Sequence, residues 1–94
     1  MDPVATKKAV RRHYAKIEEC VRRGRMDNSQ LSGDVSVQIR ISSSGRVASV
    51  RFTGENTLRS RPVEACIAAE IETWTLPAPA GGTETTIQYK WPFP

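Results

Sequence analysis

The chain has 94 residues, of which 38% are hydrophobic and 26% are charged, a balance typical of one globular domain and not of a disordered segment. No apolar run approaches the roughly 18 residues that a membrane-spanning helix needs, and the first residues contain no signal-peptide core. The formal net charge is +4, and the first 25 residues carry the whole excess, with eight Lys and Arg against three Asp and Glu. We therefore expect a single domain over 1–94, with a modest core and no deep substrate cleft.

The first predicted element is a helix over about 3–23. Asp2 and Pro3 are typical of a helix start, because Asp caps exposed N–H groups and Pro fits the first turn. Gly24 follows the last apolar position and is expected to act as the C-cap, and the polar residues 25–33 are expected to form a loop. The core-facing stripe recurs at helical spacing and comprises Val10, Tyr14, Ile17 and Val21.

Two strands joined by a hairpin are expected next, because the hydrophobic period changes to two after residue 34. Residues 43–45 are expected to form the hairpin loop, in which Gly45 is free to adopt a positive φ. The inward residues are expected to be Val35, Val37, Ile39 and Ile41 in the first strand and Ala48, Val50 and Phe52 in the second.

A second helix is expected to begin after Ser60, which can cap it, with Pro62 in its first turn. The proline- and glycine-rich run 77–82 ends this helix and leads to a last strand over about 83–91. The apolar faces are formed by Val63, Ile67, Ile71 and Trp74 in the helix and by Ile87, Tyr89, Trp91 and Phe93 in the strand.

The order of elements is therefore α-β-β-α-β, which predicts an α+β fold. A three-stranded antiparallel sheet with one apolar face needs a cover, and two amphipathic helices packed on that face supply it. The opposite face of the sheet is expected to be open to water. Its predicted residues are Ser36, Gln38, Arg40, Ser49, Arg51, Gln88 and Lys90.

Three segments of the chain carry a family resemblance. The first is a hydrophobic strand that passes through a serine-rich turn into Gly-Arg-Val at 45–47, and the second is Cys66-Ile67 followed by Trp74 in the second helix. The third is the Pro-Ala-Pro-Ala-Gly-Gly run at 77–82, which leads into a strand rich in aromatic residues. Together these segments resemble the AgmX/PglI C-terminal family, a group of TonB C-terminal-like domains found mainly in myxobacterial envelope and gliding-motility proteins.

The resemblance implies a binding module in the periplasm, at the C-terminal end of a longer envelope protein that is anchored in the inner membrane. TonB-like domains take an extended segment of an outer-membrane protein, or of another envelope protein, onto a sheet edge by strand addition. For this chain the resemblance therefore implies a place in a force-transducing or gliding-motility complex.

The two cysteines, Cys20 and Cys66, fall on the two predicted helices, which cover the same sheet face, and matched cysteines are also a feature of the family. We hypothesise a disulfide between them, provided that the compartment is oxidising. Such a bridge would add about 4 kcal/mol to the free energy of unfolding on the chain-entropy model. The alternative is two buried free thiols, since a zinc site would need more ligands than these cysteines and His13 offer.

The last strand is expected at a sheet edge, where unpaired backbone groups give affinity for an extended segment without needing particular side chains. Its outward positions Thr86, Gln88 and Lys90 are therefore the expected partner-binding residues. Two alternatives stay open at this point. One is an edge protected by Lys90 and Pro92, and the other is a homodimer formed through the same strand.

A second functional hypothesis is a basic module that docks on an anionic polymer, either cell wall or nucleic acid, through the first helix. Lys8, Arg11 and Arg12 are the residues expected to make this contact. Nucleic acid is disfavoured, because single-strand binders expose aromatic residues for stacking, whereas the aromatic positions here are expected to face the core.

No catalytic residue, metal site or cofactor is expected. His13 and Cys20 lie seven residues apart, about 10 Å along a helix, which is too far for a Cys–His hydrolase pair. We expect His13 to be an exposed helix residue. The only paired glycines follow a helix, whereas a phosphate-binding loop precedes one. We therefore predict a binding domain and not an enzyme.

Overall fold

The computed structural model describes the backbone of residues 3–94 and, except at residues 3, 4 and 80, their side chains. The predicted cap Asp2 therefore lies outside the described residues. The elements in chain order are α1 (Pro3–Asp27), β1 (Gly33–Ile41), β2 (Val47–Phe52), α2 (Arg61–Glu72), a short 3-10 helix η1 (Ala80–Gly82) and β3 (Thr85–Phe93).

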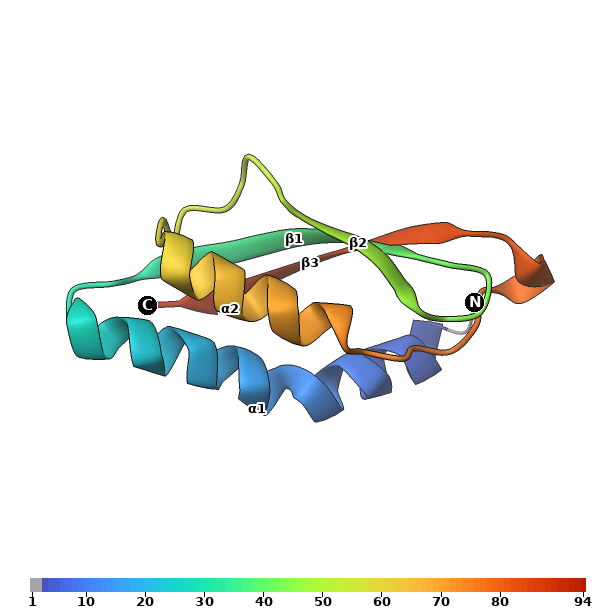
Figure 1. Cartoon of the computed structure of the whole chain (residues 1–94), viewed down its shortest axis with the longest axis horizontal. Coiled ribbons are helices and arrows are strands. Elements are labelled where there is room, and N and C mark those ends of the chain that lie inside the picture. Colours follow the sequence, from blue (N-terminus) through green and yellow to red (C-terminus); the bar gives the residue numbers. More distant parts are fainter. Residues whose placement is uncertain (1–2) are drawn as a thin grey trace.

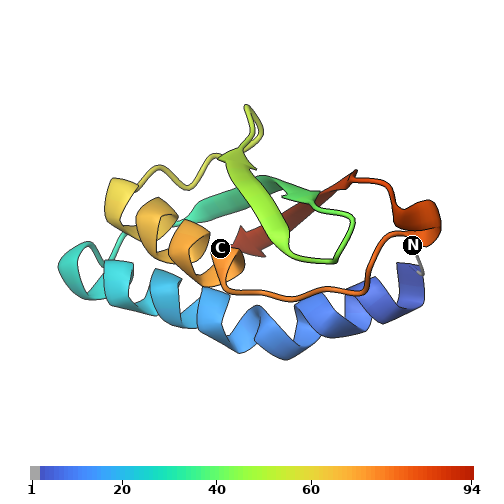
Figure 2. The same cartoon turned by 45° about the vertical axis from the view of Figure 1, so that its right-hand side comes forward.

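The three strands form one antiparallel sheet in the order β2-β1-β3. Figure 1 shows both helices on the same side of this sheet, and the turned view in Figure 2 agrees. The predicted α+β fold is confirmed in its element order and in its strand pairing. The molecule measures 44 × 24 × 19 Å, and its long dimension follows α1, whose 25 residues span about 37 Å.

The core lies between the central strand and the two helices. All four predicted inward residues of β1 are at most 1% exposed, and Ile17 of α1 and Ile67 of α2 are fully buried. Ser60 caps α2 as predicted, since its side chain accepts a hydrogen bond from the Val63 N–H at 3.4 Å. Trp74 is buried, but it lies just beyond the end of α2 and not within the helix.

Gly24 does not cap α1, contrary to the sequence prediction. The helix continues to Asp27, and the Asn28 N–H donates to the Gly24 carbonyl oxygen at 3.0 Å. A Cβ built on Gly24 would overlap Cγ2 of Val63 in α2 and would lie 2.9 Å from Cδ2 of Leu31. The glycine is therefore needed for the close approach of the two helices, a tertiary requirement that the local pattern does not reveal.

The inward face of β2 also differs from the prediction, because Ala48 is exposed. The register between β1 and β2 shifts after Arg40, so that Ile41 pairs with Val47. This irregularity adds one residue to β2 and reverses the side to which the residues before it point. Val47 is consequently half-buried against the core in the place predicted for Ala48.

Ser36 is a further correction, since it was expected on the open face but is fully buried. The loop after β2 folds over this end of the sheet. The Ser36 N–H donates to Oδ1 of Asn56 at 3.0 Å, and its hydroxyl lies 2.6 Å from the Thr53 hydroxyl.

Elsewhere the face of the sheet without helices is polar as predicted. It carries ion pairs between Arg40 and Glu84 (3.3 Å) and between Lys90 and Asp34 (3.6 Å).

We predict that Gly24→Ala lowers the free energy of unfolding by about 1–2 kcal/mol. The overlap with Val63 costs roughly 1–3 kcal/mol, which outweighs the gain of up to about 1 kcal/mol in helix propensity. Gly54→Ala is the matched control, because nothing lies within 4 Å of a Cβ built there and its φ is not positive. Urea denaturation of both variants measures the effect, and a Gly24→Ala variant as stable as the control would refute the close-approach role.

Candidate functional site

The candidate site is the outer edge of β3. The sheet order places β1 in the centre, so β3 has a strand neighbour on one side only. Its pairing with β1 runs without interruption from Gly33↔Phe93 to Ile41↔Thr85. The expectation that the last strand lies at a sheet edge is therefore confirmed.

The hydrogen bonds of β1 establish which backbone groups of β3 are unpaired. The Ser36 carbonyl oxygen accepts from the Thr53 N–H at 3.0 Å, so the even-numbered residues of β1 turn their backbone groups toward β2. Backbone groups alternate in direction along a strand, so the odd-numbered residues of β1 bond to their partners in β3, as in the pair Val37↔Tyr89. The residues of β3 whose N–H and C=O groups point away from the sheet are consequently Thr86, Gln88 and Lys90.

The C-terminal end of this edge is closed. Pro92 occupies the next outward position and has no N–H to donate. Arg25 in the last turn of α1 fixes the chain here: its Nη2 donates to the Phe93 and Pro94 oxygens at 3.1 and 2.9 Å, and its Nε donates to the Leu31 oxygen at 2.9 Å. The edge available for pairing therefore spans 86–90.

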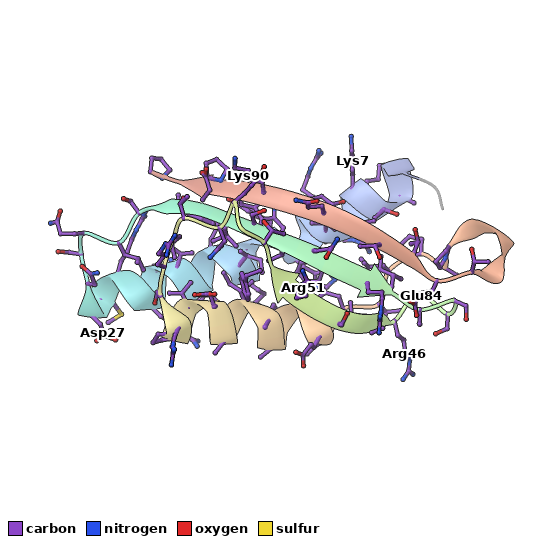
Figure 3. The ribbon with its side chains drawn as sticks, turned by 90° about the horizontal axis from the view of Figure 1, so that it is seen from above. Lys7, Asp27, Arg46, Arg51, Glu84 and Lys90 are labelled. Carbon is purple, nitrogen blue, oxygen red and sulfur yellow. A yellow bond between two sulfur atoms is a disulfide. The ribbon has the colours of Figure 1, made fainter. Side chains whose placement is uncertain are left out.

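A groove of about 330 Å³ lies on the core side of β3 at Tyr89 and Trp91, between this strand and the N-terminal half of α1. Figure 3 shows the Lys7 side chain extending past the outer edge of β3. The aromatic walls of the groove pack on one another: the rings of Tyr14 and Trp91 are 6.1 Å apart, and those of Tyr89 and Trp91 are 5.8 Å apart. The residues that line it are Lys7, Val10, Arg11, Tyr14, Tyr89 and Trp91.

Both tyrosine hydroxyls of the groove are protonated at neutral pH. Burial raises the pKa of Tyr89 above its ordinary value. The pKa of Tyr14 is raised by burial and, to a smaller extent, by the negative charge of Glu18. Each of these two side chains therefore carries an O–H group that can donate a hydrogen bond.

Lys8, Arg11 and Arg12 are exposed on α1, and they line a shared hollow on this helix. Arg11 also borders the groove beside β3. Farther along α1, Arg22 and Arg23 both pair with Glu19. By contrast, no ion pair forms between Lys7, Lys8, Arg11 or Arg12 and any carboxylate in the described part of the chain, so the first half of the helix carries four cations without such a partner there.

A disulfide joins Cys20 of α1 to Cys66 of α2, with their Cα atoms 5.7 Å apart and a sequence separation of 46. The predicted bridge is therefore confirmed. It ties the C-terminal half of α1 to α2, and together with Arg25 it restrains the position of α1 beneath the sheet. Both cysteines are in the bridge, so neither Cys20 nor Cys66 carries a free thiol.

His13 is half-buried, and not exposed as predicted, because it stacks on Trp74 with ring centroids 5.0 Å apart and an interplanar angle of 19°. Trp74 itself is buried, and its Nε1 has no hydrogen-bond partner within the described residues. Among those residues no group of three His, Cys, Asp or Glu side chains is arranged to hold a metal ion. His13 therefore acts as a packing residue.

The sequence reasoning identified the outward positions of β3 but missed the groove. The four residues that α1 contributes to the groove are three or four positions apart, which places them on one face of a helix. They are Lys7, Val10, Arg11 and Tyr14. That spacing was visible in the sequence. What it did not reveal is that this face of α1 lies beside β3, which is remote in sequence.

Comparisons with protein-family models, curated proteins and solved structures found no match to this chain. Among the described residues, no helix is both long enough and apolar enough to span a bilayer.

We predict that reducing the Cys20–Cys66 disulfide lowers the free energy of unfolding by about 4 kcal/mol, because the bridge closes a long loop in the unfolded chain. Urea denaturation with and without reductant measures the loss. A Cys20→Ala/Cys66→Ala variant is the control, since its stability should match that of the reduced protein and should not respond to reductant. Equal stability of the oxidised and reduced protein would contradict the expectation.

Proposed function

We propose that this domain binds an extended protein segment, which adds as a fourth strand to the free edge of β3. The observation that carries the proposal is the set of outward-pointing backbone groups at Thr86, Gln88 and Lys90. Strand addition uses such groups directly, since each N–H and C=O pairs with the backbone of the incoming segment.

The other sheet edge is a poorer candidate. β2 has six residues, and the register shift beside Ile41 interrupts its pairing, whereas β3 has nine residues in unbroken register. Short and irregular edges resist the addition of a further strand. The proposal therefore rests on β3 alone.

The cellular setting is part of the proposal. Disulfides persist in oxidising compartments, so the Cys20–Cys66 bridge supports a periplasmic location. With the resemblance to TonB C-terminal-like domains of the AgmX/PglI family, it supports a module of a longer envelope protein anchored in the inner membrane. In this role the domain holds a segment of an outer-membrane or other envelope protein within a force-transducing or gliding-motility complex.

The second candidate function is docking on an anionic polymer, either cell wall or nucleic acid. The observation that favours it is the hollow on α1 shared by Lys8, Arg11 and Arg12, which have no carboxylate partner in the described part of the chain. The two functions differ in salt dependence. Binding carried by backbone pairing should persist between about 50 and 200 mM salt, whereas docking on a single-stranded oligonucleotide or on peptidoglycan through these side chains should weaken steeply.

We predict that Gln88→Pro weakens the binding of an added strand by about tenfold, because it removes one outward N–H and crowds the incoming backbone. The ladder to β1 should survive, since Gln88 does not bond to β1 and Pro92 already occupies an equivalent position. NMR titration of the isotope-labelled domain with synthetic peptides from periplasm-facing segments of outer-membrane proteins measures the binding.

Gln88→Ala is the control for this experiment, because it removes the same side chain and retains the N–H. Strand addition would be supported if the peptide shifts amides in 85–93 of the wild type and of Gln88→Ala, and if it binds Gln88→Pro much more weakly. Shifts confined to the first half of α1, or equal binding to the two variants, would count against it.

A further inference from the structure

We propose that the groove between α1 and β3 selects which segment is bound: one that alternates large apolar side chains and places a carboxylate against Lys7 and Arg11. This inference rests on the proposed strand addition. It goes further in naming the side-chain chemistry of the partner and in assigning specificity to α1.

The first step is the direction of side chains in an added strand. Neighbouring strands in a sheet share their two faces, so every second residue of a segment paired with β3 points to the same side as Ile87, Tyr89 and Trp91. The groove lies on that side and is partly walled by Tyr89 and Trp91. The segment's core-side residues beside Tyr89 and Trp91 therefore enter the groove, and the residues between the core-side positions lie beside Thr86, Gln88 and Lys90.

The second step is that the core face of β3 is incompletely covered. The inward residues of β1 are at most 1% exposed, whereas Ile87 and Tyr89 of β3 and Tyr14 of α1 are only half-buried. Apolar side chains at alternate positions of an added strand would cover this surface and remove it from water. A segment with polar residues at those positions would gain only the backbone pairing.

The third step is charge. Lys7 and Arg11 lie one helical turn apart at the rim of the groove, both are exposed, and neither forms an ion pair in the described part of the chain. An acidic side chain of the segment that reaches this rim meets two cations, and Arg11 can hold a carboxylate through two N–H groups. Tyr14 and Tyr89 also line the groove, and each carries an O–H group that can donate a hydrogen bond.

Charge also argues against a second copy of the domain as the occupant. β3 reads TTIQYKWPF, which contains Lys90 and no Asp or Glu. Pairing β3 with β3 of another molecule would satisfy the backbone groups, but β3 carries no carboxylate of its own, and Glu84 just before it is already paired with Arg40. The basic rim is therefore better matched by an acidic, alternately apolar segment of a different protein.

The test uses three synthetic octapeptides and isothermal titration calorimetry. The first alternates valine and threonine and has one glutamate at a valine-side position near one end, the second has glutamine in its place, and the third has serine in place of every valine. We expect the glutamate peptide to bind roughly fivefold more tightly than the glutamine peptide, and the serine peptide to bind most weakly.

Two variants with the same change in net charge locate the effect. Lys7→Gln/Arg11→Gln alters the rim of the groove, and Lys8→Gln/Arg12→Gln removes two cations of the same helix that do not line the groove. The first variant should abolish the preference for glutamate over glutamine, and the second should retain it. Retention of the preference in the first variant, or equal loss in both, would overturn the assignment to the groove.

NMR spectra recorded with the same peptides separate this inference from the function on which it rests. If amides in 85–93 shift with all three peptides and the affinities are equal, strand addition stands and selection by the groove is wrong. If none of the peptides binds or shifts those amides, strand addition of such segments is wrong and the inference falls with it.

Discussion

The path of α1 across the sheet is the constraint on which the rest of the molecule depends. Two contacts with α2 fix it: the disulfide between Cys20 and Cys66, and the close approach of Gly24 to Val63. Arg25 adds a third restraint by holding the end of β3 and the loop before β1. All three lie in the C-terminal half of the helix, whereas the N-terminal half passes under the edge of β3 (Figure 3), where Ala9 and Val10 are buried and His13 stacks on Trp74.

This division gives the two halves of α1 different roles. The C-terminal half supplies stability through a covalent bond and close packing, and its Arg22 and Arg23 are compensated by Glu19. The N-terminal half forms one wall of a groove and carries cations without partners among the described residues. A substitution of an anchoring residue in the C-terminal half should therefore act on folding. A substitution of the cations in the N-terminal half should act on recognition.

Most of the fold was predictable from the sequence, because hydrophobic periodicity reports directly on which face of a helix or strand is buried. The alternation in β1 and the spacing of Val63, Ile67 and Ile71 placed their residues correctly in the core. The errors occurred where tertiary contacts override the local pattern. Gly24 looked like a C-cap, the register shift in β2 moved Ala48 to the surface, and a loop remote in sequence buried Ser36.

The candidate site also has one part that the sequence predicted and one part that it did not. The outward positions of β3 followed from alternation within one strand, once that strand was assumed to lie at an edge. The groove needed the relative position of β3 and α1, which begin more than 80 residues apart, and no local pattern reports on that distance. Sequence reasoning therefore reached the backbone part of the site and missed the side-chain part.

Because Pro92 donates no N–H, the two ends of the β3 edge are not equivalent for a bound segment. In the proposed complex the backbone pairing of a bound segment stops at this proline, which donates no N–H, so a length that continues from the paired residues along the sheet runs toward the opposite end of β3, beside η1 (Figure 1). Tension applied to that length would act along the strand axis and shear the pairs at Thr86, Gln88 and Lys90 together, instead of peeling them apart one at a time. An edge that binds through few hydrogen bonds would in this way resist a pull from one direction more strongly than from any other.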